Sequence, residues 1–224
     1  MTIAKIISYM GSVSSFPRFL ITIPAIIIAL VLHNLAHKCI ARRVKNTAIK
    51  NFAIKNSESF SYTHENENEN DNARPEVQNI QIPRKGVILS ALAGPAANFA
   101  TAFISLFLFY IIAVLIELVP LERELSDFVC IFLAYLLLFF QISSSLNISL
   151  GIINLIPLPP LDGATLLLVF LPIKYYFGVM KYKFHISLAL LVMLFTGVLD
   201  APLSLLHNLV LRAMDFVINL IPFI

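Results

Sequence analysis

Long runs of apolar residues constrain the fold of this chain more than any other feature of its sequence. An α-helix needs about 20 mostly apolar residues to cross the hydrocarbon of a bilayer. With 58% hydrophobic and 13% charged residues, the chain is far more apolar than a soluble domain. The sequence therefore predicts an all-α, multi-pass transmembrane helical bundle of about four spans, which we place at about Phe19–Ile40, Val87–Ile116, Phe128–Asn154 and Phe184–Leu199.

The polar segments fit one membrane-embedded domain over residues 1–224. Basic residues cluster after the first run, between 38 and 50, so the positive-inside rule predicts a cytoplasmic end there and an outside N-terminus. Residues 42–85 are polar and include the low-complexity run 64–71, which predicts a flexible cytoplasmic loop. The tail, Pro202–Ile224, mixes polar residues with leucines and predicts an amphipathic C-terminal helix. We expect it in the membrane interface, with a crossing helix as the alternative.

Charge and composition also limit the classes of partner. The formal charge is only +3, and the basic residues lie beside apolar runs, as expected of loops that orient membrane spans. This distribution predicts contact with the lipid bilayer and no nucleic-acid binding. Heavy use of isoleucine, asparagine and lysine indicates a bacterial source, and hence the cell (inner) membrane. The sequence does not indicate an oligomeric state.

Three residues form a candidate metal site within these spans. His33 and His37 are four residues apart on a predicted helix, so both imidazoles can face one cation. Asp162 follows the third span, at the same predicted membrane depth. Two imidazoles and one carboxylate suit catalytic Zn²⁺, which keeps its fourth position open. The alternatives are histidines that contact lipid headgroups and an aspartate in an ordinary turn.

Three motifs in this order resemble the site-2 protease family of intramembrane zinc metalloproteases. His33-Asn-Leu-Ala-His37 is similar to an altered HExxH, and Asn154 to Gly163 is similar to NxxPxPxLDG. Between them, Ala93-Gly-Pro95 followed by Asn98 resembles AGPxxN. Three motifs in the right order form a specific signal, whereas a five-residue metal motif alone does not.

The resemblance implies an activity and a role for each matched residue. It implies that Zn²⁺ is held by His33, His37 and Asp162, and that the protein hydrolyses a peptide bond in or near a transmembrane segment of a membrane protein substrate. It also implies that Asn154 contacts the substrate or stabilises an oxyanion. Asn98 has two interpretations, an interhelical hydrogen bond, which we favour, and a residue of the site.

Asn34 departs from the family pattern, because it occupies the position of the glutamate that serves as general base. An amide cannot accept and return a proton near neutral pH, and loss of general acid–base catalysis costs about 10²- to 10⁴-fold in rate. Three explanations are open: an inactive descendant, an engineered substitution, or a base supplied from elsewhere, for which the acidic residues between 58 and 76 are the nearest source. Zinc binding itself does not require this residue.

Two other classes of function compete with an active protease. The first is a catalytically inactive zinc-binding homologue that binds membrane protein segments without cleaving them. The second is a metal or proton pathway, because histidine and aspartate within membrane spans also mark transport routes. Transporter folds often contain internal repeats, and we find none in this sequence.

Overall fold

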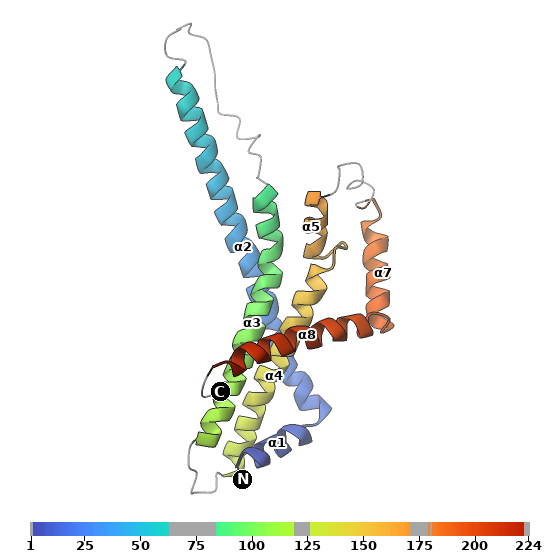
Figure 1. The fold of residues 1–224 in the computed structure, drawn as a ribbon. Helices are drawn as coiled ribbons and strands as arrows, with labels where there is room; N and C mark the ends of the chain where they lie inside the picture. Colours follow the sequence, from blue (N-terminus) through green and yellow to red (C-terminus); the bar gives the residue numbers. More distant parts are fainter. Residues whose placement is uncertain (1, 63–83, 119–125, 171–178, 180, 222–224) are drawn as a thin grey trace.

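The computed structural model describes residues 2–62, 84–118, 126–170, 179 and 181–221, and these residues form helices without any strand. The all-α fold predicted from the sequence is therefore confirmed. The helices are α1 (Thr2–Ser12), α2 (Ser15–Tyr62), α3 (Arg84–Leu118), α4 (Asp127–Leu155), α5 (Asp162–Phe170), α7 (Lys183–Phe195) and α8 (Asp200–Asn219) (Figure 1).

Four of the described helices are long and apolar enough to cross a membrane. They are the Ser15–Thr47 part of α2, and α3, α4 and α8. Many large apolar side chains on these helices point outward, including Phe19, Ile104 and Phe132. Contiguous apolar surface is costly in water and favourable in lipid. The chain is thus a multi-pass membrane protein.

The centre of the bundle is the packing of α3 between α4 and α2 (Figure 1). Small buried residues such as Ala91, Ala102 and Gly151 let the helices approach closely. A hydrogen bond of 3.1 Å joins the buried hydroxyls of Ser105 on α3 and Ser143 on α4. The bundle is therefore held by close packing and by polar contacts between helices, as is usual where lipid supplies no hydrophobic driving force.

The first long helix extends further than the sequence predicts. A flexible loop is predicted from residue 42, but α2 continues to Tyr62 (Figure 1). Residues 42–62 are rich in polar residues, and composition alone does not distinguish a loop from a helix. The beginning of the predicted loop is therefore wrong, and residues 63–83 lie outside the described part of the chain.

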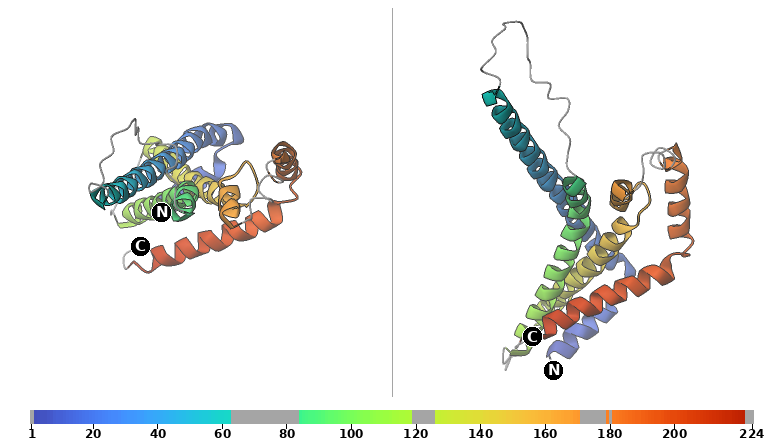
Figure 2. Two further views of the ribbon diagram at one scale, coloured as in Figure 1. Left: turned by 90° about the horizontal axis from the view of Figure 1, so that it is seen from above. Right: turned by 45° about the horizontal axis from the view of Figure 1, so that its top comes forward.

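The fourth predicted span, Phe184–Leu199, is also wrong. The helix found there, α7, ends at Phe195 and has 13 residues, which reach about 20 Å of the ~30 Å hydrocarbon. A turn follows, in which Gly197 has φ +74°, a conformation that favours glycine. The fourth helix with the length and composition of a span is instead α8, which runs across α3 and α4 rather than along them (Figures 1 and 2). Its interfacial position stays a prediction.

A short turn after α4 brings the chain back to the bundle. Prolines at 157, 159 and 160 cannot donate a backbone hydrogen bond, so α4 ends at Leu155. The next helix, α5, begins directly at Asp162 and packs against α3. Gly163 is required here, because a Cβ at this position would collide with the carbonyl oxygens of the last turn of α4. This turn determines where the Asp162 carboxylate lies.

Candidate metal centre

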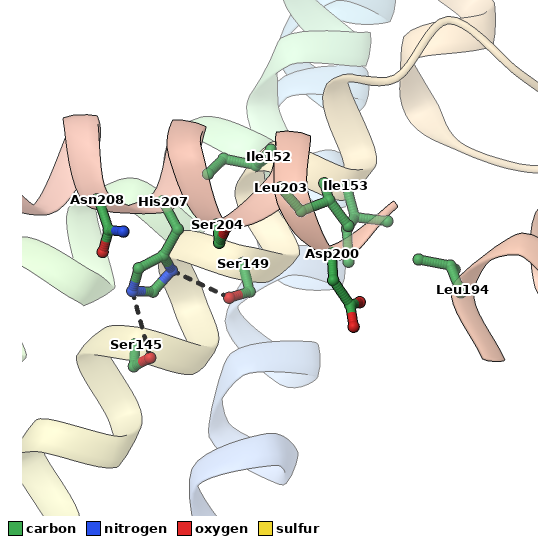
Figure 3. A pocket seen from close by; sticks show the side chains of 10 residues that line it. All are labelled: Ser145, Ser149, Ile152, Ile153, Leu194, Asp200, Leu203, Ser204, His207 and Asn208. Atoms are coloured by element: carbon green, nitrogen blue, oxygen red, sulfur yellow. Dashed lines mark hydrogen bonds between the residues drawn. The ribbon is translucent and has the colours of Figure 1, made fainter. Parts of the chain in front are cut away.

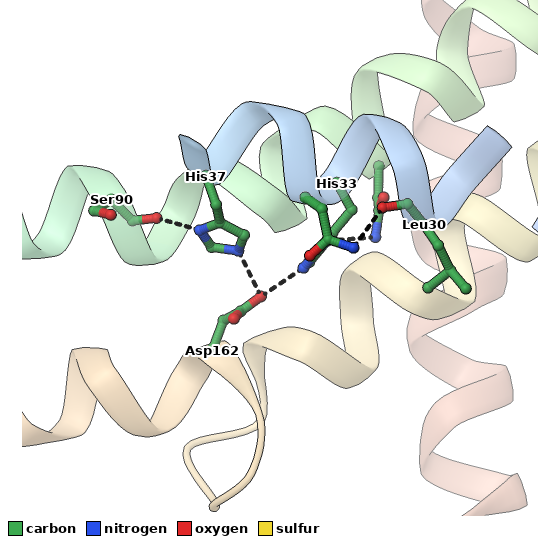
Figure 4. Close-up of polar contacts among 7 residues, drawn as sticks. Leu30, His33, His37, Ser90 and Asp162 are labelled. Carbon is green, nitrogen blue, oxygen red and sulfur yellow. Dashed lines mark hydrogen bonds and ion pairs between the residues drawn. The ribbon is translucent and has the colours of Figure 1, made fainter. Parts of the chain in front are cut away.

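Helix α2 presents His33 and His37 on one face, one turn apart, as the four-residue spacing predicts. Their ring centroids lie 4.8 Å apart at an interplanar angle of 71°. Both side chains are half-buried, and their Nε2 atoms point towards the start of α5 (Figure 4). The two imidazoles thus face the same small space.

Asp162 completes the cluster from the first residue of α5. Its Oδ2 lies 3.1 Å from Nε2 of His33 and 3.1 Å from Nε2 of His37 (Figure 4). The three ligand atoms all lie within 4.8 Å of one another. This is the only cluster of three or more histidine, cysteine or acidic residues with such spacing in the described ranges, and it has no fourth acidic member. The structure therefore brings together the three residues chosen from the sequence.

The donor atoms fit a small divalent cation. A tetrahedral zinc ion with bonds of about 2.0–2.1 Å would separate its ligand atoms by roughly 3.3 Å, close to the 3.1 Å observed for both carboxylate–imidazole pairs. Nε2 of His37 and Oδ2 of Asp162 are buried and form no hydrogen bond within the described residues. Buried polar atoms need a partner, so a bound cation would satisfy both.

Residues of α3 contact the Nδ1 atoms of both imidazole rings, opposite the Nε2 atoms that face Asp162. Nδ1 of His37 lies 2.7 Å from the backbone oxygen of Ser90, so the ring donates its Nδ1 proton there and keeps the Nε2 lone pair for a metal. Nδ1 of His33 lies 3.3 Å from Nδ2 of Asn98. Asn98 therefore makes the interhelical hydrogen bond that we favoured from the sequence. Its partner, His33, belongs to the candidate metal site.

Gly94 lies between these two contacts and forms a wall of the site. A Cβ on Gly94 would lie 2.7 Å from Nε2 of His33, and closer still to Nε2 of His37. Only a glycine lets both rings pack directly on α3. The resemblance to AGPxxN included this glycine but did not predict its contact with the two histidines. The signal was present, because Ser90, Gly94 and Asn98 recur every four residues and so share one face of α3.

Comparison with known proteins agrees with this geometry. Residues 21–196, well over half of the chain, match the family described as peptidase family M50, which is the site-2 protease family. The chain belongs to this family. The curated protein named "Putative zinc metalloprotease YwhC" from Bacillus subtilis (strain 168) is 31% identical over 159 residues, covering 67% of each chain. No solved structure matches the chain significantly.

The part that matches M50, a family of zinc metallopeptidases, contains all three candidate ligands and the whole of α3. Asn34, which the sequence motif predicts to occupy the general-base position of the family, donates its side-chain N–H to the backbone oxygen of Leu30 at 2.9 Å. Asn154 lies half-buried in the last turn of α4, and no hydrogen bond or ion pair joins it to the described members of the cluster. Its role in substrate binding stays a prediction.

A cavity of about 490 Å³ lies between α4 and α8, and its α8 side lies beyond the M50 match (Figure 3). His207 on α8 contacts the hydroxyls of Ser145 at 3.4 Å and Ser149 at 3.2 Å on α4. His207 is half-buried at this contact between the two helices. Because α8 crosses over α4, the histidine faces the serines, and each of its ring nitrogens has a partner.

Proposed function

We propose that this protein is an intramembrane zinc metalloprotease of the site-2 type, which hydrolyses a peptide bond in or near a transmembrane segment and whose hydrolytic step is slowed by Asn34. The convergence of two imidazoles and one carboxylate from α2 and α5 carries this proposal. The bacterial inner membrane is the proposed location. Membership of a zinc metallopeptidase family supports the choice of metal and of reaction.

The residues of the cluster have defined tasks in this proposal. His33, His37 and Asp162 would hold the ion, which when bound supplies a Lewis acid for a peptide carbonyl and for water. The backbone oxygen of Ser90 fixes the tautomer of His37 and so directs Nε2 at the site. The rings and the carboxylate are half-buried, which limits water without closing the site.

The surroundings of the site support a membrane-spanning polypeptide as substrate. Val31, Leu32 and Leu35 flank His33 on α2 and are exposed on the outside of the bundle. Apolar side chains at this place would contact lipid or an apolar helix. A transmembrane segment could therefore reach the site laterally, whereas a soluble peptide would have to leave water first.

Asn34 limits the chemistry that this site can perform. A glutamate here could take a proton from water and return it to the leaving amine, but an amide can do neither near neutral pH. In addition, the amide N–H of Asn34 is directed at the backbone of its own helix. We expect hydrolysis to be slower by about 10²- to 10⁴-fold than with a glutamate at this position.

The first experiment tests the metal site. The purified native chain should contain stoichiometric zinc, and His33→Ala and Asp162→Ala should lose it, because two protein ligands bind zinc far more weakly than three. His185→Ala provides the matched control, since His185 is exposed at the start of α7. Absence of zinc from the native chain, or its retention in both ligand variants, would contradict the proposal.

The second experiment tests the reaction. Cleavage of a model transmembrane substrate in proteoliposomes should rise by about 10²- to 10⁴-fold in Asn34→Glu. Asn34→Gln is the matched control, because it has the length of glutamate but cannot act as a base. Equal rates for the two variants would refute the assigned role of position 34.

The alternative function is an inactive homologue that binds zinc and captures membrane protein segments without cleaving them. The amide at position 34 specifically favours this alternative. Zinc-loaded native protein that cross-links to a transmembrane peptide but gives no cleavage during prolonged incubation would support it. Slow cleavage that requires Asp162 would support the protease instead.

A further inference from the structure

Asn98 is an unusual polar residue for the interior of a membrane protein. It lies in the middle of α3, and only 1% of its surface is exposed. Its Nδ2 lies 3.3 Å from Nδ1 of His33, whereas its Oδ1 is buried and has no hydrogen-bond partner within the described residues. An unsatisfied buried amide oxygen costs stability and requires an explanation.

Two other helical asparagines show what Asn98 does not do. Asn34 donates Nδ2–H to the backbone oxygen of Leu30, and Asn147 donates to that of Ser143, each four residues back on its own helix. This local bond is the usual solution for an asparagine within a helix. The Oδ1 of Asn147 is also buried without a partner within the described residues, so Asn98 is distinguished by the direction of its Nδ2. Asn98 is directed across to α2 instead, and it reaches the ring nitrogen opposite the proposed ligand atom of His33.

The tautomer of His33 determines whether its Nδ1 needs the N–H or the oxygen of the Asn98 amide as a partner. With Nδ2 donating to Nδ1, the ring carries its proton on Nε2, which faces Oδ2 of Asp162 at 3.1 Å. A cation bound at Nε2 requires the lone pair there, so the proton must lie on Nδ1. Nδ1 then becomes a donor and needs an acceptor; the backbone of Gly94 also interacts with this ring, so the variants of Asn98 below decide whether the amide has this task. Rotating the Asn98 amide by a half-turn supplies its oxygen at the same place.

We propose that Asn98 is a positioning residue of the metal site, whose amide oxygen accepts the Nδ1 proton of His33 when Nε2 binds the ion. The backbone oxygen of Ser90 does the same for His37. Asn98 and Ser90 thereby orient both rings from one face of α3. This inference rests on the proposed zinc site and adds a residue that does not touch the metal.

Three variants test the inference through metal affinity, measured with Zn²⁺ and Co²⁺ in competition with a chelator. Asn98→Leu should bind about 10- to 100-fold more weakly, the usual effect of losing a hydrogen-bond partner of a metal-bound histidine. Asn98→Asp should bind about as well as the native chain, because a carboxylate oxygen is also an acceptor. Asn147→Leu should bind like the native chain, since Asn147 is equally buried but bonds to its own helix.

The outcomes separate this inference from the proposed function. A native chain that binds neither metal would refute the metal site itself. Native-like affinity in Asn98→Leu, with metal still lost in His33→Ala, would refute only the role of Asn98. Aspartate keeps the oxygen acceptor of asparagine and lacks only its N–H donor. Equal weakening of metal binding in Asn98→Leu and Asn98→Asp would therefore refute the acceptor role.

A spectroscopic measurement tests the same point on the native chain, and one variant then assigns the signals. The Co²⁺-loaded native chain should show two exchangeable, paramagnetically shifted proton signals, from Nδ1–H of His33 and of His37. Both should exchange slowly with solvent because each has an acceptor on α3. In Asn98→Leu, only the His33 signal should broaden or disappear. A single protected signal in the native chain would overturn the inference.

Discussion

The contact between α3 and the two histidine rings predicts that Gly94→Ala will disable the metal site without unfolding the protein. The new Cβ would lie 2.7 Å from Nε2 of His33 and closer still to Cε1 of the same ring, whereas ordinary contacts begin near 3.4 Å, so the ring must move by more than about 0.7 Å. Nε2 of His37 would be displaced further. Metal–ligand distances tolerate only about ±0.2 Å, so neither ring can keep its place as a ligand.

The substitution should affect helix stability and metal affinity in opposite directions. Replacing glycine by alanine within a helix favours the helix by about 0.8–1 kcal/mol, so the metal-free protein should not lose helical stability on this account. Metal affinity should fall by about 100-fold or more, equivalent to about 2.7 kcal/mol of binding free energy. The expected result is therefore a folded protein with little zinc.

Two other glycines provide matched controls. A Cβ on Gly11 has nothing within 4 Å, so Gly11→Ala should be neutral in every assay. Gly151→Ala produces a milder clash, at 2.9 Å, with the ring of Phe99 instead of a histidine. The assays are zinc content after dialysis, Zn²⁺ affinity by chelator competition, and thermal unfolding in detergent. Native zinc affinity in Gly94→Ala, or an equal loss in Gly151→Ala, would refute the reasoning.

Three further predictions concern other contacts of the fold. His207→Ala should lower the melting temperature, because it removes contacts to two serines worth about 0.5–1.5 kcal/mol each. His185→Ala should leave the melting temperature unchanged, because His185 is exposed. Equal melting curves for the two variants would contradict this prediction. Gly163→Ala should reduce zinc content, because the clash is with backbone that cannot rotate away; unchanged zinc would show that the turn adapts. Asp127 accepts a hydrogen bond from Lys5 and raises the pKa of that amine above 10.5. The stabilisation of α1 by this contact should therefore persist from pH 7 to 9 and be lost only above about pH 10.5. Hydrogen exchange of α1, corrected for intrinsic rates, would detect an earlier loss.

The candidate metal ligands could be predicted from the sequence because their positions follow from local rules. The spacing of His33 and His37 places both rings on one helix face whatever surrounds the helix. Asp162 follows a proline-rich break after an apolar run, and that run determines its depth in the membrane. Neither inference requires knowledge of which helices are neighbours.

The contacts from α3 could not be derived in the same way. The four-residue recurrence of Ser90, Gly94 and Asn98 defines a face of the helix, but periodicity does not say which helix that face meets. Nearly all residues of α3 are apolar or small, so the usual contrast between a polar and an apolar face is absent. Only the packed structure shows that this face carries the partners of both histidines.

The errors in the helices have a related cause. Apolar composition indicates that a segment avoids water, but it does not indicate where a helix ends. The turn at Gly197 was therefore missed, and α7 was predicted to be long enough to cross the membrane. Polar composition likewise reports contact with water, and the extension of α2 beyond residue 42 was taken for a loop. In both segments, backbone conformation decided the structure and composition did not reveal it.

The arrangement of the site across α2, α3 and α5 has a consequence for biosynthesis. The helix with both histidines, α2, leaves the ribosome before α3 and α4, whereas Asp162 follows only after these two helices have been made. A nascent chain that has inserted only α2 has two imidazoles but neither the carboxylate nor the carbonyl of Ser90. Stable metal capture therefore follows insertion of the third long helix. Once captured, the ion would link the first long helix to the segment after the third, so metal loading would mark a completed bundle.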